Sequence, residues 1–153
     1  MVAIVASIEI SRRPEEVFAY ATDFAHFTEW QGGVVDARRV GTSPLGLGSR
    51  AVVARRVGPR ELLRTEEITE LRPPRTWSVR GVGGPVIAIA KGSVEPLDNG
   101  RRSRVTIELD FEGRGLGRLL VPLIIRRQAR RQLPRNEQKL KELLEGRAGP
   151  GAS

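Results

Sequence analysis

Alternation of apolar and polar residues predicts that the chain begins with a strand. Residues 2–11 follow a period of two, as expected for a strand with one buried face. A helix follows, for which Ser11 is the expected N-cap, and Pro14 lies in its first turn. A second short helical segment, 23–30, carries three aromatic residues and ends before a Gly-Gly pair.

Six further strands are predicted between short turns rich in glycine and proline. They cover residues 34–40, 50–57, 60–71, 76–82, 86–97 and 104–111. Asp98-Asn99-Gly100 is a hairpin signal between the last two strands. Consecutive strands joined by such short turns favour an antiparallel meander.

A long helix is predicted over residues 115–146. Its first half contains the run 119–125, which is apolar on every side and must be covered by protein or by an apolar ligand. Its second half has an apolar face made of Ala129, Leu133, Leu140, Leu143 and Leu144, and a basic face made of Arg126, Arg127, Arg130, Arg131 and Arg135. Pro134 removes a backbone hydrogen bond at a cost of about 3 kcal/mol, which predicts a bend or break near Leu133.

These elements predict an α+β fold with one domain over residues 1–146. An antiparallel sheet with one buried face needs a cover, and the long helix is the only predicted element large enough. Residues 147–153, rich in glycine and small residues, are expected to be a frayed tail.

Composition narrows the possible chemistry. The chain has no cysteine and one histidine, which excludes disulfides and thiolate metal sites, so neither a metal site nor a cofactor is expected. The net charge of +8 raises the question of nucleic acid, but no nucleic-acid-binding motif accompanies it, and the arginine-rich, glycine-rich composition is typical of a GC-rich genome. No signal peptide or apolar run of about 20 residues is found, so we expect a cytoplasmic protein.

Four segments resemble the polyketide cyclase/dehydrase-like branch of the START/Bet v 1 (SRPBCC) superfamily. They are SRRPEEVFAYATD with the later Trp30, TEEITELRPPRTW, SRVTIELDFEG and GLGRLLVPLIIRR. Together they extend the resemblance over about residues 2–146, in the right order. It implies a helix-grip fold, in which a curved seven-stranded antiparallel sheet wraps around the C-terminal helix, with two short helices after the first strand.

The resemblance also implies a hydrophobic cavity between sheet and helix. The function expected from it is binding of an apolar or amphipathic molecule, such as a lipid, quinone or polyketide, by a carrier or sensor. The alternative is a polyketide cyclase or dehydratase acting by acid/base chemistry on a bound substrate.

Candidates for the apolar wall of this cavity are Phe27, Trp30, Val53, Trp77, Val79, Leu116, Leu120, Leu123 and Ile124. Each is also compatible with an ordinary core residue. Ala88, Ala90 and Gly92 share one face of a strand, and small side chains opposite a helix leave room for a ligand. That argument requires Ile87 and Ile89 to face outward.

Arg64 and Glu66 are the candidate polar ligand-binding residues, because they share a strand face with Leu62 and Ile68. If this face is inward, they form a buried pair, and if it is outward, they are solvated. Glu66 is also the candidate catalytic base. His26, beside Phe27 in a short amphipathic helix, is expected at the surface.

The basic face of the last helix has three interpretations: a solvated face, a transient contact with an anionic membrane, or a nucleic-acid surface. Nucleic acid is the least expected partner, because the chain lacks any motif for it. The pattern does not specify an oligomeric state.

Overall fold

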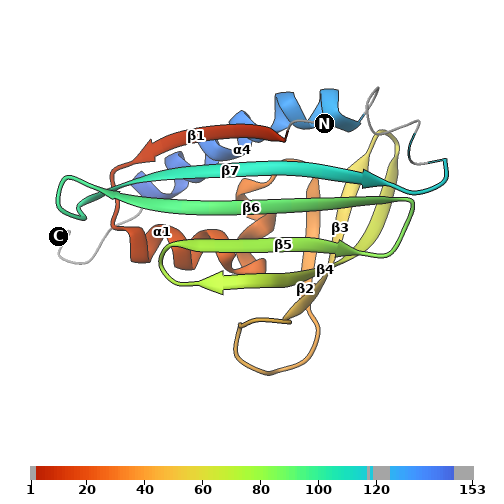
Figure 1. Ribbon diagram of the computed structural model, residues 1–153, viewed down its shortest axis with the longest axis horizontal. Coiled ribbons are helices and arrows are strands. Elements are labelled where there is room, and N and C mark those ends of the chain that lie inside the picture. Colours follow the sequence, from red (N-terminus) through yellow and green to blue (C-terminus); the bar gives the residue numbers. More distant parts are fainter. Residues whose placement is uncertain (1–2, 117, 119–124, 147–153) are drawn as a thin grey trace.

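A seven-stranded antiparallel sheet curves around two groups of helices in the computed structural model, which describes residues 3–116, 118 and 125–146 (Figure 1). The elements are β1 (Ile4–Ile10), α1 (Pro14–Thr22), η1 (Phe24–His26), α2 (Phe27–Trp30), β2 (Val34–Arg39), β3 (Arg50–Val57), β4 (Arg60–Arg72), β5 (Thr76–Val82), β6 (Val86–Leu97), β7 (Arg102–Gly113) and α4 (Arg126–Glu145). The predicted fold class and order of elements are confirmed.

The strands from β2 to β7 form a meander, and the first strand joins its far edge. The order across the sheet is β1-β7-β6-β5-β4-β3-β2, so β1 pairs with the last strand in the chain. β6 and β7 turn through Asp98 and Asn99, both with positive φ, at the predicted hairpin. This sheet has one concave face that needs an apolar cover.

Helix α4 supplies part of that cover. Leu133, Leu140 and Leu144 are buried in one core with inward side chains of the sheet. The helix is continuous across Pro134, so the predicted break near Leu133 does not occur. Burial of these leucines offsets the hydrogen bond that proline cannot make. The apolar half of the predicted helix, 119–124, lies outside the described residues.

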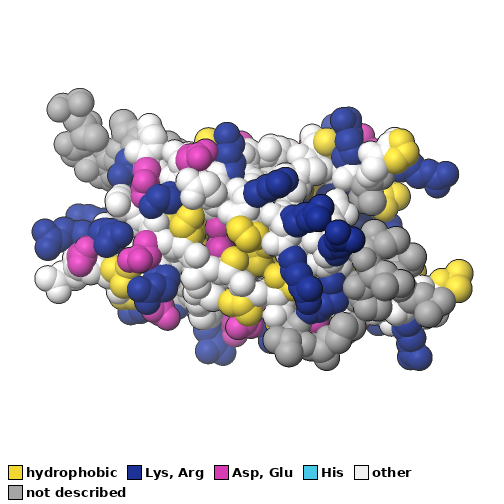
Figure 2. Space-filling model, turned by 90° about the horizontal axis from the view of Figure 1, so that it is seen from above, with side chains coloured by type: hydrophobic (Ala, Val, Ile, Leu, Met, Phe, Trp, Pro, Cys, Tyr) yellow, Lys and Arg dark blue, Asp and Glu magenta, His cyan; other side chains and the backbone are white. Residues whose placement is uncertain are grey.

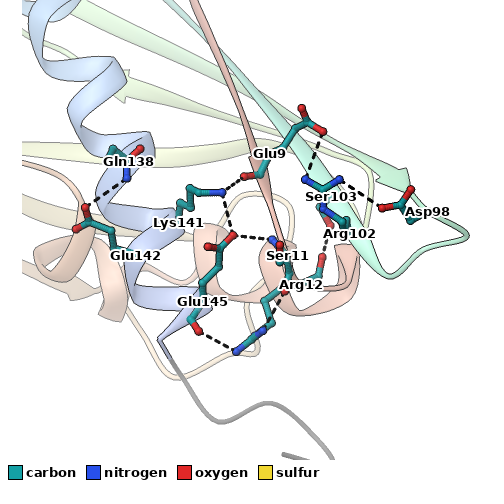
Figure 3. Close-up of polar contacts among 10 residues, drawn as sticks. All are labelled: Glu9, Ser11, Arg12, Asp98, Arg102, Ser103, Gln138, Lys141, Glu142 and Glu145. Atoms are coloured by element: carbon teal, nitrogen blue, oxygen red, sulfur yellow. Dashed lines mark hydrogen bonds and ion pairs between the residues drawn. The ribbon is translucent and has the colours of Figure 1, made fainter.

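A cluster of polar contacts fastens the end of α4 to the β1–α1 junction (Figure 3). The Ser11 backbone N–H donates to Glu145 Oε2 at 2.8 Å, and Lys141 Nζ donates to the Glu9 carbonyl at 2.6 Å and to Glu145 Oε2 at 3.0 Å. Arg12 Nη2 donates to the Glu145 carbonyl at 3.2 Å. We call Glu9, Ser11, Arg12, Lys141 and Glu145 the helix latch.

The latch corrects the expected role of Ser11. Helix α1 begins at Pro14 with Arg13 as its N-cap, and Arg13 makes no side-chain capping bond. Ser11 lies too early to cap, and its backbone N–H binds the last helix instead. Burial opposes ionisation of Glu145, but the hydrogen bonds from Ser11 and Lys141 outweigh it and lower the pKa of Glu145.

Candidate functional site

The strand register defines which side chains face the concave side of the sheet. Trp77 lies opposite Gly92, which lies opposite Ile107, and all three face inward. By the same alternation, Ala88 and Ala90 lie on the face of Gly92, and Ile87 and Ile89 lie on the other face. Burial does not follow this alternation, because Ile87 is 2% exposed whereas Ala88 is exposed. Space above the small residues of β6 therefore stays a prediction.

The concave face is solid at the end that lies beside α1. The rings of Phe18 and Trp77 meet edge to face with centroids 5.7 Å apart. A Cβ added to Gly92 would lie 2.1 Å from Trp77 Cζ2, so the indole already occupies the space above this glycine. Val94 and Val105 are fully buried beside them. We call this region the packed end.

Burial falls along the same strands toward the β5–β6 turn. Ala88 is exposed although it faces inward, and the inward residues Gly81, Ala90, Leu109 and Phe111 are only partly buried. A Cβ at Gly81 would meet only backbone of Ala88 and a methyl of Ile87, at 3.6–3.9 Å. Among the described residues, no helix atom is one of these nearest neighbours. We call these five residues the exposed end.

Glu66 lies inward on β4, near the exposed end, and is buried at 9% exposure. Its Oε1 accepts a hydrogen bond from Arg55 Nη2 on β3 at 2.7 Å, and the same nitrogen lies 3.2 Å from Gln31 Oε1. A charge-assisted bond of this kind is strong when partly buried. The two strands and the end of α2 therefore meet in one polar cluster.

The structure does not pair Glu66 with Arg64, which corrects the buried pair expected for an inward face. Arg64 Nη1 donates to the Leu63 carbonyl, and its guanidinium lies beside Gly84 in the β5–β6 turn. Glu66 is bound by Arg55, which the sequence analysis missed. The period of two on β3 was the available signal, because it places Arg55 on the face of Ala51 and Val53.

The other predicted wall residues fall into three groups. Phe27, Trp30, Val53, Trp77 and Val79 are buried in the core. Leu116 is 80% exposed. Leu120, Leu123 and Ile124 lie outside the described residues, and their place in the wall stays a prediction.

His26 lies at the surface between two carboxylates. Its Nδ1 is hydrogen bonded to Glu29, its Nε2 lies 3.8 Å from Asp23, and its ring stacks on Tyr20. These contacts are local to the helical segment. They give His26 a structural role at the start of α2.

Glu137 is the most unusual buried residue of the described chain. It lies on the inner face of α4 between Leu133 and Leu140 and is 1% exposed. Its Oε2 has no hydrogen-bond partner, and neither has Nε1 of Trp30. Burial raises the pKa of Glu137 to about 8. The sequence signal was its position in the leucine period, which we overlooked because the residue is charged.

Comparisons with known proteins agree with this architecture. The sequence profile of the family described as polyketide cyclase / dehydrase and lipid transport matches residues 1–145. The chain belongs to this family. No curated protein is similar enough in sequence to match.

Several solved structures have a similar fold, and their alignments cover nearly the whole chain. A Thermus thermophilus protein is 18% identical with a TM-score of 0.74, over 92% of this chain and 94% of that one. A START superfamily protein from Mycobacterium smegmatis is 13% identical with a TM-score of 0.70, over 95% and 96%. At such low identities the likeness establishes the fold.

The ARO/CYC protein BexL, which has two domains, is also similar. It is 16% identical with a TM-score of 0.72, and the alignment covers 95% of this chain and 47% of BexL. Folds of this shape thus occur both in a START superfamily protein and in an ARO/CYC protein. The resemblance found in the sequence is confirmed.

The outer surface of α4 is the basic face of this chain. Arg127, Arg130, Arg131, Arg135 and Lys139 are exposed, and no carboxylate of the described chain pairs with them. Lysine and arginine side chains gather on this side of the molecule (Figure 2). The prediction that Arg126 belongs to this face was wrong, because Arg126 is buried with its Nη1 3.7 Å from Asp110.

Among residues 3–116, 118 and 125–146, no helix is both long and apolar enough to span a bilayer. No three histidine, cysteine or acidic residues of the same described ranges are grouped as metal ligands would be.

Proposed function

We propose that the chain binds an apolar or amphipathic small molecule between the concave face and the C-terminal helix, as a carrier or sensor. The ligand class is a lipid, a quinone or a polyketide-like compound. The observation that carries the proposal is the fall in burial along inward faces that are otherwise apolar. Ligand sites of this kind are concave and apolar with few polar groups.

The residues proposed for binding are those predicted from the sequence. Phe27, Trp30, Val53 and Val79 supply apolar surface, Trp77 limits the site at the packed end, and Leu116, Leu120, Leu123 and Ile124 stay proposed from the sequence. Arg64 and Glu66 supply polar groups near the exposed end, with Arg55 added by the structure.

Native mass spectrometry of the purified protein tests binding, followed by organic extraction and identification of released compounds. A stoichiometric lipid, quinone or polyphenol supports the proposal and names the ligand class. An unliganded mass is followed by thermal melting with a panel of these compounds, since a ligand that binds only the native state raises Tm. No adduct and no shift would contradict binding.

The alternative function is catalysis on a polyketide-like substrate, for which Glu66 is the candidate base. The observation in its favour is a buried carboxylate held by Arg55 beside an apolar surface. Replacing Glu66→Gln would abolish turnover in an enzyme but leave ligand affinity nearly unchanged in a carrier. Turnover is followed by product formation from a poly-β-ketone substrate, with Glu67→Gln as the matched outward control.

The basic face of α4 supports a transient contact with anionic membranes during ligand exchange. Five exposed cations on one helix face complement negatively charged lipid headgroups. Liposome flotation with and without anionic lipid compares the wild type with the triple variant Arg127, Arg130 and Arg131→Ala. The control removes equal charge elsewhere, at Arg60, Arg72 and Arg75. Equal flotation of both variants and the wild type would contradict the contact.

A further inference from the structure

Two polar atoms in the core beneath α4 have no hydrogen-bond partner. They are Oε2 of Glu137, which is 1% exposed, and Nε1 of Trp30, which is 5% exposed. An unsatisfied buried polar group costs about 1–3 kcal/mol, and an apolar residue of similar shape avoids that cost. Folding stability therefore does not account for either group.

The two atoms belong to α2 and α4, and a hydrogen bond connects these helices. The Gly32 backbone N–H, just after α2, donates to Asn136 Oδ1 on α4 at 2.8 Å. Gly32 is two residues from Trp30, and Asn136 is adjacent to Glu137. Side chains of α2 and α4 thus enter the core from one junction, and both Trp30 and Leu133 belong to the same apolar cluster.

The junction also connects to the polar cluster at β3 and β4. Gln31 follows Trp30 directly and lies 3.2 Å from the guanidinium of Arg55, which binds Glu66. Gln31 and Arg55 thus connect the α2–α4 junction, which carries Trp30 and Glu137, to the region to which we assign the ligand. The surroundings of the unsatisfied groups are aromatic, since the rings of Phe27 and Trp30 lie 6.1 Å apart at 82°.

The chemistry of the two groups specifies what would satisfy them. At neutral pH the carboxyl of Glu137 is mostly protonated, because burial raises its pKa to about 8. A protonated carboxyl is an O–H donor, and an indole N–H is a donor only. Two donors in an apolar environment match an acceptor oxygen without a charge.

We propose that Glu137 and Trp30 form the buried anchor of the ligand site and donate hydrogen bonds to a carbonyl oxygen of an otherwise apolar ligand. This inference rests on the proposed binding function and narrows it to ketones and quinones. The anchor selects the oxygen, and the apolar wall accommodates the rest of the ligand.

The test compares two probes that differ in their carbonyl groups, menadione and methylnaphthalene. Binding is measured by calorimetry at neutral pH on the wild type, Glu137→Leu, Glu137→Gln and Trp30→Phe. The chain has no cysteine, so menadione does not react with a protein thiol. Glu142→Leu, on the exposed side of the same helix, is the matched control.

Glu137→Leu should weaken menadione binding about tenfold, which corresponds to one lost hydrogen bond, and leave methylnaphthalene binding unchanged. Glu137→Gln keeps a donor and should retain most of the affinity. Trp30→Phe should also lose preference for menadione, and Glu142→Leu should behave as wild type. Glu137→Leu should melt at a higher temperature than wild type, whereas a carboxyl needed for folding would make this variant less stable.

The outcomes separate the inference from the function on which it rests. If both probes bind and Glu137→Leu keeps the preference for menadione, the anchor is wrong and ligand binding stands. A bound water that satisfies both atoms would give this same result. If neither probe binds the wild type and extraction yields no ligand, the proposed function fails and the anchor with it.

Discussion

At the packed end of the sheet the inward side chains are buried against helix α1 and the latched end of α4, whereas at the exposed end residues of the same strands are partly exposed. The difference lies in side-chain size. Trp77 fills the space above Gly92, but in the described part of the chain no side chain comes as close to Gly81. One continuous face thus contains a region that stabilises the fold and a region available for function.

The helix latch adds to the difference between the two ends. It holds the last turn of α4 to the β1–α1 junction at the packed end (Figure 3). Local stability in proteins varies with contact density and with satisfied hydrogen bonds. Substitutions should therefore affect stability strongly at one end and ligand affinity at the other.

Replacing Trp77 by alanine should cause the largest loss of stability. Removal of a buried tryptophan costs about 3–5 kcal/mol, here together with its contact to Phe18. Phe111→Ala, an aromatic truncation at the exposed end, should cost about 1 kcal/mol. Urea denaturation measures both, and equal losses would mean that the two ends do not differ.

Glu137→Gln should change how stability depends on pH. The pKa of Glu137 is about 8 in the folded chain and near 4.5 when unfolded, so the native state holds the extra proton between these values. The contribution of Glu137 to stability should therefore be greatest below pH 4.5 and fall toward pH 8, by at most about 1.4 kcal/mol per pH unit.

The variant lacks this slope, because its amide does not titrate. Charged residues on the adjoining elements are engaged elsewhere: Lys141, one turn further along α4, binds Glu9 and Glu145, and Glu29 of α2 binds His26. The inward residues of β1 and β7 that pack against α4 are apolar. Denaturation midpoints of the wild type and Glu137→Gln between pH 4.5 and 8 measure the difference. The same pH dependence in both proteins would contradict it.

A pair of glycine substitutions sharpens the comparison of the two ends. Gly92→Ala places a methyl group against the indole of Trp77 and should cost about 1–3 kcal/mol. Gly81→Ala meets only ordinary contacts and should change stability by less than about 0.5 kcal/mol. Thermal melting of the two variants measures the difference. A lower Tm for Gly81→Ala than for Gly92→Ala would contradict it.

Weakening the latch should have a small effect. Lys141→Ala removes two hydrogen bonds from a partly exposed site and should cost less than about 1 kcal/mol. The pKa of Glu145 is lowered in the fold, so its contribution is present above its unfolded value of 4.5 and is lost as pH falls. Acid unfolding should therefore begin at higher pH in Lys141→Ala than in the wild type.

The fold was predictable because its signals are local. Period-two strands, Gly- and Pro-rich turns and an amphipathic last helix each appear in a few consecutive residues, and their order resembled a known family. The strand ranges agreed within a few residues, although β7 begins at Arg102 and not at Arg104. The helix predicted over residues 115–146 agrees over its second half, where α4 covers Arg126–Glu145.

The polar contacts were less predictable because they depend on spatial neighbours. Arg55 lies opposite Leu62 in the register, yet its long side chain reaches Glu66 further along β4. Arg126 was wrongly placed at the surface, and Glu137 was overlooked. Charged residues usually lie at the surface, unless the tertiary structure supplies a reason for burial. Local patterns do not contain that information.

The placement of the two tryptophans provides the protein with a pair of optical reporters. The chain contains only Trp30 and Trp77. Trp77 lies in the packed end against Phe18, so its emission should follow global unfolding. Trp30 lies at the junction of α2 and α4, so quenching of its emission by a bound quinone would be absent in Trp30→Phe. Two single-tryptophan variants could thus record folding and occupancy separately in one fluorimeter.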